Sequence, residues 1–192
     1  MEYEYILIII GAIFVNNIVL AQFLGICPFM GVSSKVKTAV GMGGAVLFVM
    51  TLAVIVTWII MHYVLIPFEI QYMQTIAYIL VIASLVQMVE IILKKMSPAL
   101  YQALGVFLPL ITTNCAILGV AILVIQKEFN LLKSVIFSIG NAAGFALALI
   151  IFAGIREHMD KLNIPEGMKG IPASLVVAGI LALAFMGFAG MV

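Results

Sequence analysis

The chain contains two cysteines, and each lies in one of two segments that are built alike. The first segment, residues 16–31, reads NNIVLAQFLGICPFMG, and the second, residues 104–119, reads LGVFLPLITTNCAILG. Aligning the two segments places Cys27 on Cys115. Polar groups are costly inside apolar stretches long enough to enter a bilayer, so a matched pair of them indicates a functional site. We therefore look for the chemistry of this protein at the two cysteines.

Metal binding is the chemistry that two such thiols favour. Thiolates are soft ligands that suit iron-sulfur clusters, zinc or cuprous ion. Two thiolates complete neither a tetrahedral site nor a 2Fe-2S cluster, which takes four ligands. His62 and His158 are expected near opposite membrane surfaces, at the outer end of the second apolar stretch and in the fifth loop, so they cannot complete the set. The missing ligands would come from a second copy of the chain or from a homologous partner.

Two other interpretations of the cysteines stay open at this point. Each cysteine could be a small buried hydrophobic residue, which membrane helices tolerate well. A disulfide is a poorer match, because a pair inside the membrane meets little of the oxidising machinery.

The composition places the chain in a lipid bilayer. Hydrophobic residues make up 66% of the 192 residues and charged residues only 9%, which is typical of an integral membrane protein. A formal net charge of +1 argues against nucleic acid as a partner. We predict a single membrane domain over residues 1–192.

Six apolar stretches have the length of membrane-spanning helices, about twenty residues each. They cover residues 5–26, 39–62, 73–93, 100–125, 132–155 and 171–191. We expect an all-α integral membrane protein with six transmembrane helices in two three-helix repeats, over residues 5–98 and 99–192. Because each repeat has an odd number of spans, the two copies run through the membrane in opposite senses, as an inverted repeat.

Breaks are expected in the first and fourth helices, next to the cysteines. Pro28 follows Cys27 directly, and Gly25 and Gly31 flank the pair. Pro109 precedes Cys115 in the fourth stretch. Proline and glycine interrupt helices, so the sequence predicts that the two cysteines enter from opposite faces and converge.

The basic residues predict the orientation of the chain. Seven of the nine lie in the first, third and fifth loops. Cytoplasmic loops carry the excess of Lys and Arg, so both termini should face outside.

Polar side chains beside the cysteines have two possible roles. They could hydrogen-bond to a bound metal centre, or they could cap the ends of broken helices, whose backbone groups cannot stay unpaired in lipid. Together with Gly25, the candidates are Asn16, Asn17, Thr112, Thr113 and Asn114.

Two further features lie inside predicted spans. Glu90 is four residues before Lys94, which favours an ordinary helical ion pair over a role in ion handling. Gly140 and Gly144 form a GxxxG pair, for which close packing against another helix is the default explanation.

The chain resembles a known family in three segments: NNIVLAQFLGICPFMGVS, LGVFLPLITTNCAILGVA and the closing LALAFMGFAG. The family contains the RnfA and RnfE proteins of the bacterial Rnf complex, an ion-translocating ferredoxin:NAD oxidoreductase. It also contains NqrD and NqrE of the sodium-translocating NADH:quinone reductase. The similarity extends over essentially the whole chain.

The resemblance implies the place of RnfA, paired with the homologous RnfE and assembled with RnfB, RnfC, RnfD and RnfG in the bacterial cytoplasmic (inner) membrane. The pair would hold a 2Fe-2S cluster, with Cys27 and Cys115 as two ligands and two thiolates from the partner. Electrons would pass through this cluster, coupled to sodium or proton export.

Three alternatives remain on the sequence. The chain could be the NqrE protein of the quinone reductase, a secondary transporter, or a structural protein that only organises its partners. Inverted repeats with broken helices are the usual build of carriers, although the predicted spans contain no paired acidic residues at the midplane.

Overall fold

The computed structural model of this chain describes residues 2–96, 108–162, 165–168 and 170–188. Within these ranges every regular element is a helix. In chain order they are α1 (Glu2–Ile10), the π-helix η1 (Gly11–Val15), α2 (Ile26–Gly31), α3 (Val36–Ile60), the π-helix η2 (Met61–Leu65), the 3-10 helix η3 (Gln71–Met73), α4 (Gln74–Met96), α6 (Leu108–Thr112), α7 (Cys115–Gln126), α8 (Leu131–Met159), the 3-10 helix η4 (Glu166–Met168) and α9 (Ile171–Met186). The all-α prediction is confirmed for this part of the chain.

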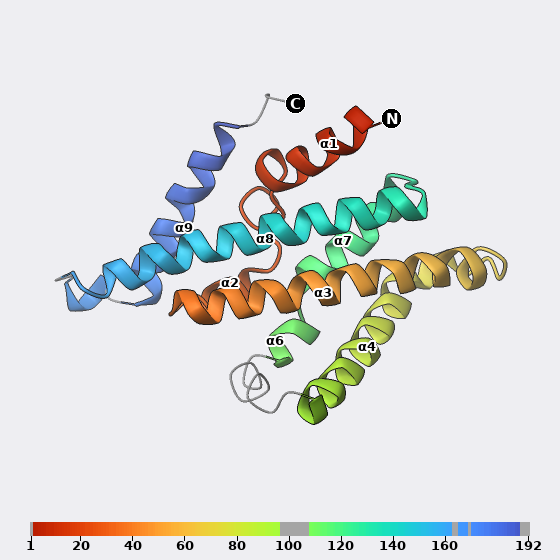
Figure 1. The fold of residues 1–192 in the computed structure, drawn as a ribbon, viewed down its shortest axis with the longest axis horizontal. Coiled ribbons are helices and arrows are strands. Elements are labelled where there is room, and N and C mark those ends of the chain that lie inside the picture. The colour runs from red at the N-terminus through yellow and green to blue at the C-terminus, as the bar shows by residue number, and fades with distance from the viewer. Residues whose placement is uncertain (1, 97–107, 163–164, 169, 189–192) are drawn as a thin grey trace.

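Two long helices, α3 and α8, form the centre of the fold and run antiparallel along each other (Figure 1). At one end the Nε1–H of Trp58 donates to the Phe129 carbonyl over 3.0 Å. In the middle, a Cβ atom added to Gly43 of α3 would lie 2.8 Å from the Cβ of Ala146 of α8. Small residues that let two backbones approach closely are the usual packing of membrane helices.

The lengths of the helices agree with a membrane protein. Four stretches are long and apolar enough to cross a bilayer: Val36–Leu65, Gln71–Ile92, Pro109–Gln126 and Leu131–Met159. Two further apolar helices, Tyr3–Val15 and Ile171–Met186, are shorter. Each of the six expected stretches therefore has a helical counterpart, but the first and the last do not reach the length of a full span within the described residues.

The end of α8 differs from the expected boundary. The sequence predicts that the fifth stretch ends near residue 155, whereas α8 continues to Met159 and includes Arg156 and His158 in its last turn. Basic side chains near a helix C-terminus are stabilised by the helix dipole, which explains why the helix extends past the apolar run. His158 is thus a helical residue and not a loop residue.

The first helix is interrupted earlier than the sequence predicts. The π-helix η1 ends at Val15, residues 16–25 are irregular, and α2 then begins at Ile26. Pro28 does not break this helix but occupies the first turn of α2, where its missing N–H has no intrahelical partner to lose. In the fourth helix, Pro109 likewise lies in the first turn of α6, and the interruption comes at Thr113 and Asn114.

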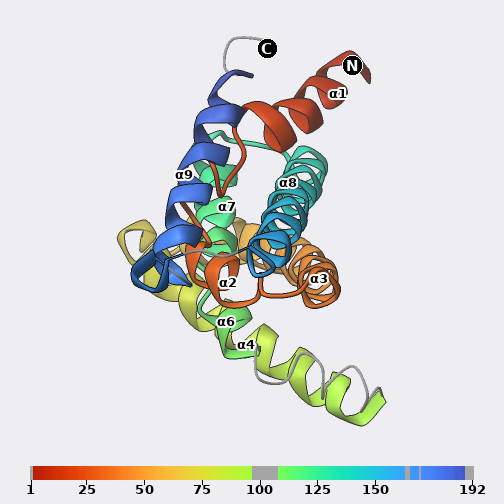
Figure 2. The same ribbon diagram turned by 90° about the vertical axis from the view of Figure 1, so that its left-hand side faces the viewer.

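The helices α4 and α9 lie at the periphery of this arrangement. Figure 2 shows α4 leaning away from α3 and α8, and only 17% of its apolar window is buried. The start of α1 and the end of α9 lie on the same side of the molecule in Figures 1 and 2. The short helices α2, α6 and α7 lie between the periphery and the central pair, and they carry the two cysteine segments.

Candidate functional site

Asn17 organises the first interruption, between η1 and α2. Its side chain is fully buried. The Nδ2 group donates to the carbonyl oxygens of Ile13, at 3.0 Å, and of Gly144, at 2.9 Å. The Oδ1 atom accepts from the backbone N–H groups of Val19, at 3.1 Å, and of Leu20, at 3.3 Å. Backbone groups released at a helix end need partners in lipid, and this single amide satisfies four of them.

The GxxxG pair of α8 brings the first interruption close to the central helices. A Cβ atom on Gly140 would lie 3.2 Å from the Cβ of Ala12. A Cβ atom on Gly144 would lie 3.1 Å from both the Ala12 carbonyl oxygen and the Ile13 Cα. The close packing predicted from the GxxxG spacing is confirmed, and its partner is the segment formed by α1 and η1.

Asn114 organises the second interruption, between α6 and α7. It is 3% exposed and is the N-cap residue of α7. Its Oδ1 atom accepts from the Ala116 N–H over 3.0 Å, the usual N-cap bond. The Thr113 hydroxyl donates to the Pro109 carbonyl over 2.9 Å. The capping role expected for these polar residues therefore accounts for Asn17, Thr113 and Asn114.

The two interruptions touch at the sulfur of Cys115. The backbone N–H of Gly25 donates to the Cys115 Sγ atom over 2.9 Å. Gly25 is buried and has φ +80°, in the left-handed region. A Cβ atom there would also lie 2.8 Å from Cε2 of Phe145 and 3.1 Å from the Cβ of Ala116. Conformation and space both require glycine at this position.

Two leucines make a reciprocal contact between the cysteine segments. Leu24, from the first interruption, packs on Gly119 of α7, where a Cβ atom would lie 2.6 Å from Leu24 Cδ1. Leu110 of α6 packs on Gly31 of α2, where a Cβ atom would lie 3.3 Å from Leu110 Cδ1. Gly31 and Gly119 are the glycines that the alignment of the two segments matches, so each repeat receives a leucine from the other at the same position.

The cysteines occupy equivalent places in this arrangement. Cys27 is the second residue of α2, and Cys115 is the first residue of α7. Both cysteines are exposed on the surface of the chain. Because Gly25 touches Cys115 and consecutive Cα atoms are about 3.8 Å apart, the Cα of Cys27 lies within about 12 Å of the Cys115 sulfur. The convergence predicted from the sequence agrees with this geometry.

The donor set fits half of a four-thiolate metal centre. Among the residues that the structure describes, no group of three or more His, Cys, Asp or Glu side chains could hold a metal ion. The chain thus offers two nearby sulfurs, and their exposure leaves room for ligands from another chain. The positive end of the twelve-residue helix α7 lies at Cys115, which favours negative charge on the sulfur or on a group bound to it.

Asn16 lies at a different feature. It lines a cavity of about 410 Å³ between α1, η1, α7 and α8, together with Gln22 and Asn141. Glu4 also lines this cavity, and its carboxylate forms an ion pair of 2.6 Å with Lys133. Asn16 is therefore not a capping residue like Asn17.

Thr112 and Glu90 complete the list of candidates. Thr112 is the last residue of α6 and is half-buried. Glu90 is half-buried on α4, and its pairing with Lys94 stays a prediction.

Arg156 is a supporting residue whose role the sequence does not indicate beyond its value as a marker of orientation. Its Nη1 group donates to the Met30 carbonyl and to the Ser33 Oγ atom, both at 2.7 Å. These contacts lie at the C-terminal end of α2, the helix that carries Cys27. The last turn of α8 thereby holds that helix in place. The partners are more than one hundred residues away in sequence, and no local pattern indicates them.

These features define an all-helical membrane protein in which two interrupted helices bring a pair of exposed cysteines together. Comparison with known proteins agrees with this class. Residues 5–192 match the family model described as "Rnf-Nqr subunit, membrane protein", and the chain belongs to this family.

Three relatives cover nearly the whole chain and are themselves covered nearly completely. The RnfA protein of the ion-translocating oxidoreductase complex of Syntrophotalea carbinolica is 59% identical over 97% of both chains. The RnfA protein of the Na(+)-translocating ferredoxin:NAD(+) oxidoreductase complex of Acetobacterium woodii is 57% identical over 97% of both. The corresponding protein of Aeromonas hydrophila is 51% identical over 98% of both.

Proposed function

We propose that this chain is the RnfA protein of an Rnf complex, an ion-translocating ferredoxin:NAD oxidoreductase of the bacterial cytoplasmic membrane. In this role it carries electrons across the membrane through a 2Fe-2S cluster held by Cys27, Cys115 and two thiolates of the homologous RnfE. Electron transfer is coupled to the export of sodium or protons, and RnfB, RnfC, RnfD and RnfG are the other members of the assembly.

The names of the relatives support the identity of the complex. Each of the three relatives described above is the same component of an ion-translocating oxidoreductase, and the one from Acetobacterium woodii is named for sodium, ferredoxin and NAD. These names favour the Rnf complex over the quinone reductase as the assembly to which this chain belongs.

The observation that carries the cluster assignment is the contact between Gly25 and the Cys115 sulfur, which brings the two cysteine segments together. Both sulfurs are accessible to another chain. A 2Fe-2S cluster takes four thiolates, so two such half-sites from homologous proteins complete one centre. When bound, the cluster supplies a one-electron carrier at membrane depth. The chain contributes the two sulfurs, the rigid interruptions that position them, and the backbone donor at Cys115.

Three contacts support the inverted three-helix repeat. The second span of each expected repeat corresponds to α3 and α8, and these run antiparallel along each other. Leu24 packs on Gly119 and Leu110 on Gly31, which is a reciprocal exchange between the two halves. An in-plane two-fold axis between the cysteines relates equivalent elements in this way.

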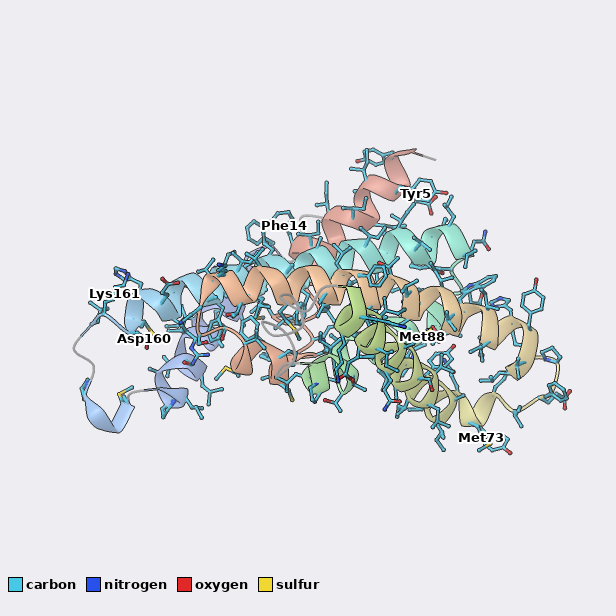
Figure 3. All side chains as sticks on the ribbon, turned by 60° about the horizontal axis from the view of Figure 1, so that its bottom comes forward. Tyr5, Phe14, Met73, Met88, Asp160 and Lys161 are labelled. Carbon is cyan, nitrogen blue, oxygen red and sulfur yellow. The ribbon has the colours of Figure 1, made fainter. Side chains whose placement is uncertain are left out.

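The distribution of charge supports an orientation with both termini outside. Lys35, at the start of α3, and Arg156, in the last turn of α8, share one end of the central helix pair. Figure 3 places Asp160 and Lys161 at that end and Met73 at the opposite end. At the opposite end, Lys133 is paired with Glu4. A lysine paired with a carboxylate is a weaker signal for the cytoplasmic side than the basic cluster at the other end.

Reporter fusions test this orientation. A fusion after Lys161 should report the cytoplasm, and a fusion after Phe188 should report the exterior. A matched fusion after Lys127, in the loop between α7 and α8, should also report the exterior. A cytoplasmic reporter after Phe188 would contradict the inverted arrangement.

Iron and sulfide analysis tests the function. This chain and its homologous partner are produced together and purified as a pair, away from the other iron-sulfur proteins of the complex. We expect iron and acid-labile sulfide in equal amounts, near two of each per pair, because a 2Fe-2S cluster contains two irons and two sulfides.

The outcome separates the functions left open by the sequence. A secondary transporter or a purely structural protein predicts a pair without iron, whatever its stability. A stable pair that contains neither iron nor sulfide after anaerobic purification would overturn the proposed function.

A further inference from the structure

The hydrogen bond between Gly25 and Cys115 joins a donor of one interruption to the sulfur of the other. The donor is the backbone N–H of the N-cap residue of α2, and the acceptor is the first side chain of α7, at 2.9 Å. The two residues belong to different sequence repeats. A main-chain donor is present whatever the side chain, so this contact depends only on the conformation of the first interruption.

The donor is held rigidly. Gly25 is buried, and its carbonyl accepts from the Phe29 N–H over 3.2 Å, which ties it to the first turn of α2. Phe145, Ala116 and the Oδ1 atom of Asn114 surround its Cα, all within 3.2 Å of where a Cβ atom would stand. The N–H therefore stays directed at the sulfur without reorganisation when charge on that sulfur changes, which is the property of a preorganised dipole.

A donor aimed at a metal-bound sulfur acts on the reduction potential. Reducing an iron-sulfur centre adds negative charge, and in a low-dielectric site that charge is costly unless nearby dipoles compensate it. A hydrogen bond to the sulfur is stronger when the acceptor carries more negative charge. It therefore stabilises the reduced state more than the oxidised state and raises the potential.

We propose that the Gly25 N–H is the donor that tunes the redox centre at Cys115, and that Gly25 is a positioning residue for electron transfer. This inference rests on the proposed function. Gly25 acts through the sulfur and does not itself bind the metal. The first repeat then sets an electronic property of the ligand supplied by the second, so the two interruptions form one functional unit.

The contact itself can be tested on the cluster-free full chain in detergent. All 16 glycines are labelled with nitrogen-15, and the Gly25 amide is assigned from the signal that disappears in Gly25→Ala. Its hydrogen exchange is then compared between Cys115→Ala and the matched Cys27→Ala. We expect exchange about tenfold faster in Cys115→Ala, because the net stabilisation by one hydrogen bond corresponds to about that factor. Exchange should be unchanged in Cys27→Ala, while the Gly140 and Gly144 amides stay protected in both.

The tuning role is tested in the purified complex by redox titration followed with electron paramagnetic resonance. In Gly25→Ala, the φ of +80° and the contact with Phe145 force the backbone to move. We expect the cluster signal to remain and its midpoint potential to fall. Gly31→Ala is the matched control in the same segment, because its Cβ meets only the end of the Leu110 side chain, at 3.3 Å. Its potential should be unchanged.

A second measurement needs no substitution at Gly25. In the unaltered complex with nitrogen-15 glycine, the reduced centre should show a hyperfine coupling to one glycine nitrogen, and unlabelled glycine should remove it.

The outcomes separate the inference from the proposed function. Equal exchange of Gly25 in the two cysteine variants, an unchanged potential in Gly25→Ala, or the absence of the nitrogen coupling overturns the inference alone. A complex with no cluster signal overturns both, and the exchange experiment then still decides whether the contact exists.

Discussion

Replacing Cys27 or Cys115 with serine should abolish the electron paramagnetic resonance signal of the membrane cluster in the purified complex. Each cysteine contributes one of only two sulfurs of this kind on the chain. A serine hydroxyl is a hard ligand that suits iron in a thiolate cluster poorly, and a cluster with three thiolates lacks a complete ligand set. The signals of the other iron-sulfur and flavin centres should persist, and electron flow through the complex should stop.

The double variant gives the sharper form of this test. If both cysteines bind one cluster, Cys27→Ser with Cys115→Ser should lose no more than either single variant, because residues that act as a unit are not additive. Thr51→Ala serves as a control, since this exposed hydroxyl donates only to the Leu47 carbonyl of its own helix, at 2.8 Å. Single variants that keep the signal and normal electron flow would exclude both cysteines as ligands.

The sequence predicts the cysteine pair better than it predicts the shape of the chain around it. The matched segments correctly indicate that the two cysteine regions meet, because the same residues recur at the same spacing. The predicted position of the first break is wrong, because it treats Pro28 as a helix breaker. Proline is compatible with the first turn of a helix, and α2 begins two residues before it. A local pattern cannot distinguish a proline that ends one helix from a proline that starts the next.

The contacts that hold the interruptions could not be predicted, because they join distant parts of the chain. Asn17 is a typical capping residue, but nothing near it indicates that its amide reaches the Gly144 carbonyl, 2.9 Å away. The charge of Arg156 is evident from the sequence, whereas its bonds to Met30 and Ser33 are not. In contrast, the GxxxG spacing of Gly140 and Gly144 predicts close packing correctly, since small residues one turn apart create a groove whatever fills it.

Substituting Gly144 with leucine should prevent the first interruption from docking on α8. The Cβ atom alone would lie 3.1 Å from the Ala12 carbonyl oxygen and the Ile13 Cα, and 3.2 Å from Nδ2 of Asn17. Overpacking costs about 1–3 kcal/mol, and a buried amide that loses its partners costs about 1–3 kcal/mol more. The expected loss in the free energy of unfolding, about 2–6 kcal/mol by these terms, is a large part of the total for a typical domain. Gly144→Ala should give a smaller loss.

Gly154→Leu is the matched control on the same helix, because a Cβ atom at Gly154 meets nothing within 4 Å. Both variants gain the same helix propensity, so the difference between them isolates the contact with η1. Unfolding in detergent can be followed through the single tryptophan, Trp58, whose indole is bonded to the Phe129 carbonyl close to the start of α8. Cluster assembly with the homologous partner should fall in Gly144→Leu and not in Gly154→Leu, because η1 and Asn17 support the segment that carries Cys27. If the two leucine variants unfold alike and bind equal amounts of iron, the packing of η1 on α8 does not position the cysteine site.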